Sequence, residues 1–159
     1  MDDQIGFDIE FDDKTTAFLS WVDPEQMEAG VRVFLAETVP GIAEYADTWW
    51  NSPLTLQILE AAKEFFGDKE GFLAVENRAA ADNFTRFYGE CFVRRAGMDW
   101  TNRPEWPSEQ YDDFSPAVRF DHGNIISMWA MVKDLFRDTD GPWSLDNSVE
   151  MARRYPQGT

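Results

Sequence analysis

The sequence has one cysteine, one histidine and few basic residues, and each shortage narrows what the chain can do. Cys91 has no second cysteine with which to form a disulfide inside the chain, which favours a reducing compartment. Because His122 is the only histidine, a multi-histidine metal site is impossible, and any catalytic triad with a histidine would have to use it. No apolar run is long enough to suggest a membrane span.

Motifs for cofactors and metals are also lacking. There is no phosphate-binding Walker loop, no dinucleotide glycine fingerprint and no zinc-ligand spacing. Asp138–Gly141 resembles part of a calcium loop, but Phe136 and Asn147 then stand where Asp and Glu are required. The first residues are acidic where a signal peptide is basic and then apolar. The sequence therefore predicts a cytoplasmic protein with no cofactor, no metal and no membrane contact.

Acidic residues are what the chain has in excess. Thirty Asp and Glu stand against fourteen Lys and Arg, for a net charge of -16 over 159 residues. Residues 1–47 alone contain twelve acidic residues and two basic ones. Such a charge attracts cationic partners, whereas binding to a nucleic-acid backbone requires Lys and Arg. With seven Trp and thirteen Phe, the chain is expected to fold rather than to form an acidic disordered tail.

The length predicts a single domain over 1–159, because no linker or repeat divides the chain. We expect an acidic N-terminal strand and helices in 1–70. A long helix, two short strands and C-terminal helices are expected in 71–159. The predicted class is α+β: a predominantly helical single domain with a small antiparallel sheet.

In the first part, alternation of apolar and polar residues predicts a strand over Ile5–Phe11 with its acidic side chains in solvent. Asp23 followed by Pro24 predicts a helix that continues to about Glu37. A short helix is expected over Ile42–Trp50.

Further along, Ser52-Pro53 resembles a helix start, and Gly67 would end that helix. The longest helix is predicted over Phe72–Ala96, with Cys91 as a buried structural thiol on its apolar face.

Beyond that helix, short strands are predicted over Met98–Thr101 and Ala117–Asp121, and an amphipathic helix over Ile125–Arg137. His122 lies in Asp121–Asn124, a composition typical of a turn. A last short helix, with Ser144 as its cap, is expected to end near Tyr155.

The connection between the two predicted strands, residues 102–116, is long for a loop and rich in both aromatic and acidic residues. Exposed rings with flanking charge are typical of an interface hot spot and its rim. The alternative is that its rings pack onto the core. The acidic residues of the N-terminal strand are a second candidate, although they equally suit the solvated side of an edge strand. The predicted partner-binding residues are Asp8, Glu10, Asp12, Asp13, Glu105, Trp106, Glu109, Tyr111, Asp112 and Asp113.

In size, charge and the helix–strand–strand–helix order of residues 72–137, the chain resembles the small acidic immunity proteins of bacterial toxin systems. No diagnostic motif carries the resemblance, so no residue role is transferred. It implies a cytoplasmic, non-enzymatic inhibitor that binds a protein partner with a basic surface and covers a positively charged active site.

Two other functions remain open from the sequence. The chain could mimic DNA and inhibit nucleic-acid enzymes, as phage anti-restriction inhibitors do, although so many rings suit that role less well. It could also be an enzyme of unrecognised type that uses carboxylates with His122.

Overall fold

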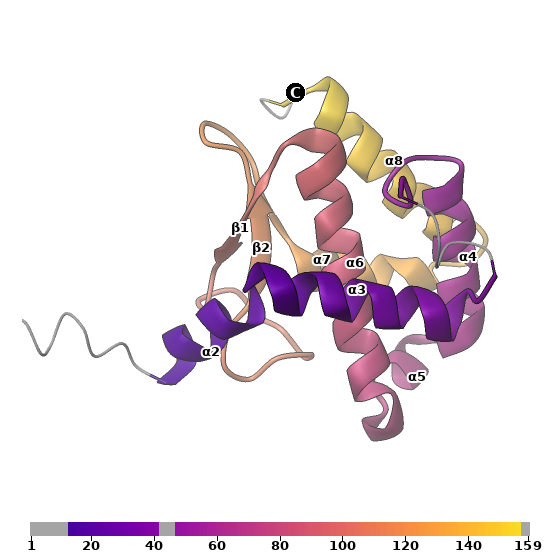
Figure 1. The fold of residues 1–159 in the computed structure, drawn as a ribbon, viewed down its shortest axis with the longest axis horizontal. Helices are drawn as coiled ribbons and strands as arrows, with labels where there is room; N and C mark the ends of the chain where they lie inside the picture. The colour runs from indigo at the N-terminus through magenta and orange to yellow at the C-terminus, as the bar shows by residue number, and fades with distance from the viewer. Residues whose placement is uncertain (1–12, 42–46, 157–159) are drawn as a thin grey trace, which may run out of the picture.

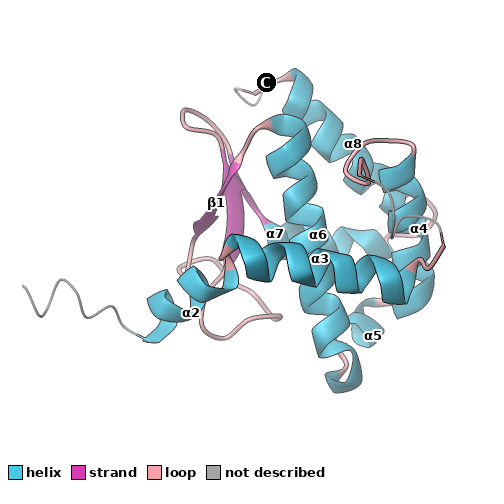
Figure 2. Ribbon diagram, viewed as in Figure 1, coloured by secondary structure: helices cyan, strands magenta, loops and turns pink. Residues whose placement is uncertain are grey.

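The computed structural model describes residues 13–41 and 47–156. These residues form seven α-helices, two short 3-10 helices and one three-stranded antiparallel sheet (Figures 1 and 2). The predicted class, a mostly helical α+β fold with a small sheet, is confirmed. The strand predicted over Ile5–Phe11 lies outside the described residues, as do Asp8, Glu10 and Asp12.

Helix α6 (Arg78–Ala96) is the centre of the molecule. Its residues from Phe84 to Phe92 are buried without a break, so that helix faces neighbours on all sides. Helix α3 (Pro24–Thr38) crosses α6, and α8 (Gly141–Arg154) packs beside it (Figure 1).

The predicted start of α3 is confirmed. The Asp23 carboxylate accepts hydrogen bonds from the backbone amides of Glu25 and Gln26 at 3.2 and 3.3 Å, and Pro24 occupies the first turn. The next predicted helix is also present, as α4 (Leu54–Phe66).

Gly67 ends α4 with a φ of +84°, as its position predicts. Ser52, in contrast, does not cap α4, because Pro53 is the residue before the helix. The Ser52 hydroxyl donates instead to Asp146 of α8.

The helix predicted over Ile42–Trp50 is wrong where the structure can test it. Residues 47–50 form a bend and a turn, with Trp49 fully buried. The Thr55 hydroxyl donates to the Trp49 carbonyl at 2.7 Å, which holds the chain in this turn before α4 begins.

The long helix predicted from Phe72 is interrupted. Phe72 belongs to the short helix α5 (Lys69–Leu73), and a 3-10 turn, η1 (Val75–Asn77), separates it from α6. The Gly71 carbonyl accepts from the Ala74 amide and from the Asn77 carboxamide, the latter at 2.8 Å, so a side chain shares in satisfying an α5 carbonyl where the helix ends. The predicted end of α6 at Gly97 is confirmed.

The sheet has the order β1 (Asp99–Asn102), β2 (Pro116–Arg119) and β3 (Ile125–Ser127). The first two strands were predicted to within two residues. The β2–β3 turn contains His122, which is exposed, as the turn composition predicts.

Strand β3 occupies the beginning of the helix predicted over Ile125–Arg137. Ile125 and Ile126 pair with β2, because β-branched residues suit a pleated, half-buried surface. Helix α7 (Met128–Val132) begins only after Ser127, whose hydroxyl accepts from the Ala130 amide, and a 3-10 turn η2 (Lys133–Phe136) follows. The last helix, α8, begins at Gly141 rather than at Ser144, with Pro142 in its first turn.

The buried apolar residues form two clusters. The main core fills the space between α3, α4, α6, α8 and the sheet. Aromatic rings in mutual contact make up much of it, among them Phe34, Phe66, Phe72, Phe84 and Phe87. The second cluster consists of Phe18, Trp21, Met27 and Phe114, with Trp100 and Tyr111 packed against them. It joins α2 (Asp13–Trp21) to the chain around residues 102–116.

Candidate functional site

Residues 102–116 connect β1 to β2 as a closed loop. The Asn102 side-chain oxygen accepts from the Ser115 amide at 2.9 Å, and the Arg103 amide donates to the Ser115 carbonyl at 2.9 Å. The two ends of the segment are therefore joined at the sheet, and its middle lies over α6.

Asp82, on α6, holds this loop and α2 together. Its carboxylate accepts from the Trp21 indole at 2.7 Å and from the Tyr111 hydroxyl at 2.5 Å, and it lies 3.5 Å from the Arg86 guanidinium. Burial, and then the Asp82 charge, raise the pKa of Tyr111 well above its ordinary value, so this tyrosine remains a hydrogen-bond donor at physiological pH.

Gln110 adds a second attachment to α6. Its carboxamide nitrogen donates to the Thr85 hydroxyl at 2.9 Å and to the Ala81 carbonyl at 3.2 Å. The Ser108 hydroxyl accepts from the Gln110 and Tyr111 amides, which shapes the turn before them. These hydrogen bonds attach the middle of the loop to α6.

The structure separates the three rings of the loop. Phe114 is buried in the second cluster, and the half-buried Tyr111 packs against it with ring centroids 5.1 Å apart. Trp106 is also half-buried but belongs to neither apolar cluster. The Arg103 guanidinium lies 4.8 Å from the Trp106 ring centroid, a cation–π distance that holds the indole in place. Trp106 is therefore the ring of this loop that packs into neither cluster.

Trp106 lies between two hollows of the surface. One, of about 280 Å³, is lined on its other sides by Lys14, Asp112 and Asp113. The other, of about 600 Å³, extends to Trp129 and Lys133. A half-buried indole with a hollow on each side is the geometry of an anchor around which a partner can pack.

The acidic residues of the loop fall into two groups. Glu105 pairs with Arg103 at 2.8 Å, and Glu109 with Lys69 at 3.1 Å. Asp112 and Asp113 are exposed and form no ion pair with the described residues. Both residues line the hollow beside Trp106, together with the cationic Lys14.

Of the other predicted partner-binding residues, Asp13 is exposed at the first turn of α2. Asp8, Glu10 and Asp12 lie outside the described residues, so their part in a binding surface stays a prediction. For Tyr111, the structure gives a positioning contact with Asp82 in place of an exposed ring.

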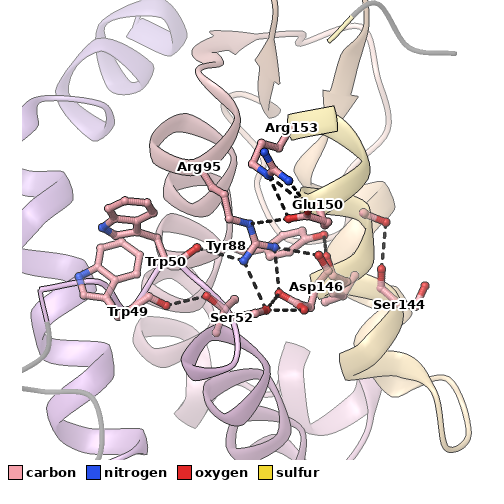
Figure 3. Close-up of polar contacts among 12 residues, drawn as sticks. Trp49, Trp50, Ser52, Tyr88, Arg95, Ser144, Asp146, Glu150 and Arg153 are labelled. Carbon is pink, nitrogen blue, oxygen red and sulfur yellow. Dashed lines mark hydrogen bonds and ion pairs between the residues drawn. The ribbon is translucent and has the colours of Figure 1, made fainter. Parts of the chain in front are cut away.

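Arg95 is the centre of a second polar cluster, and this one is buried (Figure 3). Its guanidinium donates to the Asp146 carboxylate and backbone carbonyl, each at 2.9 Å, and to the Trp50 carbonyl at 3.2 Å. The Ser52 hydroxyl bonds to the same Asp146 carboxylate. The cluster clamps the chain at residues 50–52 and α8 onto α6.

Glu150 lies at the edge of the Arg95 cluster. Hydrogen bonds from Arg153, and further from Arg154, hold the pKa of Glu150 at about 2. Since Asp146 and Glu150 are both engaged by arginines, we assign this cluster a structural role.

The other reactive side chains are placed as the sequence predicts. Cys91 is fully buried, and burial raises the pKa of its thiol far above the ordinary value. His122 is exposed in the β2–β3 turn, at the end of β2 remote from the 102–116 loop. Within residues 13–41 and 47–156, no three His, Cys, Asp or Glu side chains are grouped so that they could hold a metal ion. No helix in the same ranges is long and apolar enough to cross a membrane.

Sequence reasoning missed Asp82, Arg86 and Gln110, which position the loop. The i,i+4 spacing of Asp82 and Arg86 indicates a helix ion pair, but Trp21 lies 61 residues from Asp82 in sequence. Contacts over that distance leave no local pattern.

Comparison with models of known protein families, with curated proteins and with solved structures found no match to this chain.

Proposed function

We propose that this chain is a non-enzymatic acidic inhibitor of the immunity-protein type, which neutralises a cognate toxin or enzyme by covering a positively charged active site. The observation that carries the proposal is Trp106, a half-buried indole between two hollows with unpaired carboxylates beside it. A central aromatic anchor supplies slow dissociation, and surrounding charge supplies fast association with an oppositely charged partner.

The net charge supports the same partner chemistry. A chain of charge -16 is attracted to a basic surface and repelled by nucleic acid, so the proposed partner is a protein with a basic cleft. A free, buried thiol suits the cytoplasm, which we propose as its location.

Affinity capture with the full chain as bait tests this proposal in cells of the source organism. Wild type is compared with Trp106→Ala and with Asp112→Asn/Asp113→Asn. The matched control is Glu60→Gln/Glu64→Gln, which removes the same charge from exposed positions on α4, on the other side of the molecule (Figure 1). The expected result is one basic protein bound one-to-one by wild type and control, whose activity the chain inhibits.

In calorimetry with the purified partner, Trp106→Ala is expected to cost more than about 1 kcal/mol of binding free energy, as hot-spot truncations do. The double Asn variant is expected mainly to slow association and to flatten its salt dependence. Tyr111→Phe, which keeps the ring in the second cluster, is expected to bind like wild type. Capture of several unrelated nucleic-acid enzymes would favour a DNA mimic instead. A partner bound equally by all variants would contradict the proposed surface.

A further inference from the structure

A hollow at the other end of the sheet is independent of the partner-binding surface. The 102–116 loop leads into β2, whereas this hollow lies beyond the other end of β2 and is lined by residues of the β2–β3 turn and of the last turns of α8. Its volume is about 370 Å³, within the range of small-molecule sites.

The walls of the hollow come from three elements. Phe120 and Ile126 line it from the hairpin, Met131 from α7, and Met151 and Tyr155 from the end of α8. Phe120 and Ile126 lie on the same face of the hairpin as buried Val118. Both are partly buried and pack against the edge of the main core. Rings and flexible thioethers that surround a space of this size favour an aromatic occupant, because sulfur–aromatic contacts are attractive.

Two carboxamides add hydrogen-bonding capacity to these apolar walls. Asn124 and Asn147 are among the lining residues, and within the described ranges neither side chain forms a hydrogen bond to another protein group. A carboxamide presents a donor and an acceptor side by side, which matches a ligand edge with a neighbouring C=O and N–H.

The charge of the lining separates this hollow from those around Trp106. Among the described residues, no charged side chain lines it, whereas Asp112, Asp113 and Lys133 line the other two. A charged ligand would lose hydration here without gaining an ion pair, so an uncharged one is favoured.

We propose that the hollow between the β2–β3 turn and α8 is a binding site for an uncharged, planar heteroaromatic compound of one or two fused rings with an amide-like edge. The rings lie between Phe120 and Met151, and Asn147 bonds to the polar edge.

The probe for this site is oxindole, a fused-ring lactam, with the anion indole-carboxylate as its charged counterpart. Saturation-transfer NMR and calorimetry on the full chain measure the binding of both. We expect oxindole to bind with a Kd near or below about 1 mM, as suits a ligand of its size, and the anion to bind at least about tenfold more weakly.

Variants decide whether the hollow is responsible. Asn147→Leu and Met151→Ala are each expected to weaken oxindole binding by about tenfold or more, with thermal unfolding as the check on folding. Trp143→Ala is the matched control, since it removes a 58% exposed ring from α8 outside the hollow. The proposal is overturned if oxindole does not bind wild type, if both variants bind it normally, or if the anion binds equally well. None of these results depends on the toxin partner.

Discussion

The main core and the second cluster are held by different means. Phe84 in the main core is fully buried, and its ring packs against Phe34, Phe66, Phe72, Phe87 and Tyr88. The second cluster has four buried residues, and hydrogen bonds with Asp82, Thr85 and Arg86 attach it and the neighbouring loop to α6. The loop with Trp106 therefore belongs to a small unit that polar contacts position on a larger apolar one.

Trp100 and Gly89 lie where the two regions meet. The Trp100 ring packs against both clusters, and its indole donates to the buried Glu90 carboxylate at 2.8 Å. A Cβ at Gly89 would overlap this ring, so glycine allows the close approach of β1 to α6. The junction between the two clusters therefore requires glycine at position 89 to accommodate the Trp100 ring.

The largest effect is expected from the main core. Phe84→Ala leaves a cavity surrounded by rings and should lower the free energy of unfolding by about 3–5 kcal/mol. Phe18→Ala in the second cluster should lower global stability by only about 1–2 kcal/mol, because that unit can detach without opening the main core. Urea unfolding of both variants measures the contrast. Equal losses would show that the two clusters unfold as one.

An intermediate effect is expected from the polar attachment. Asp82→Asn removes the charge that Trp21, Tyr111 and Arg86 share and should weaken the attachment of the loop by about 1–2 kcal/mol. Chymotrypsin, which cuts at aromatic residues, should then cleave the 102–116 loop several-fold faster, while cleavage elsewhere stays slow. Asp99→Asn, an exposed acid on β1, serves as the control. An unchanged cleavage rate for Asp82→Asn would show that packing alone holds the loop.

The smallest effect is expected for the pH dependence of stability that Glu150, on α8, contributes. The pKa of Glu150 falls from 4.5 to about 2 on folding, so its contribution to stability is complete above about pH 4.5 and is lost as pH falls toward 2. Glu150→Gln should remove this part of the acid sensitivity, at a cost near neutral pH of less than about 1 kcal/mol. The loop with Trp106 should be unaffected. Thermal unfolding of wild type and Glu150→Gln at several pH values between about 2 and 7 measures this acid sensitivity. A pH profile of the variant identical to that of wild type would contradict the role given to Glu150.

Local signals account for what the sequence predicted well. Asp23-Pro24, Gly67 and Gly97 fix helix ends through backbone chemistry within a few residues, and all three are where the sequence placed them. The wrong elements depend on contacts from elsewhere. Ile125 and Ile126 join β2 as a strand, because pairing across the hairpin outweighs their helical spacing.

The candidate site was predicted in part. Composition marked the 102–116 loop, but not which of its rings would pack into the second cluster. Tyr111 turns inward because Asp82, Thr85 and Gln110 form a polar group beneath it, and two of these lie on α6, far from the loop in sequence. Within the described residues Trp106 has a cation–π contact with Arg103 and no aromatic partner, and it remains half-exposed.

Native-state hydrogen exchange in a low-urea series tests the division into two regions most directly. We predict that amides of α2 and of residues 102–116 exchange through a partial opening, at a free energy at least about 2 kcal/mol below that of α6 and α8. A single opening free energy shared by all of these segments would contradict the account, since the loop with Trp106 would then belong to the main core.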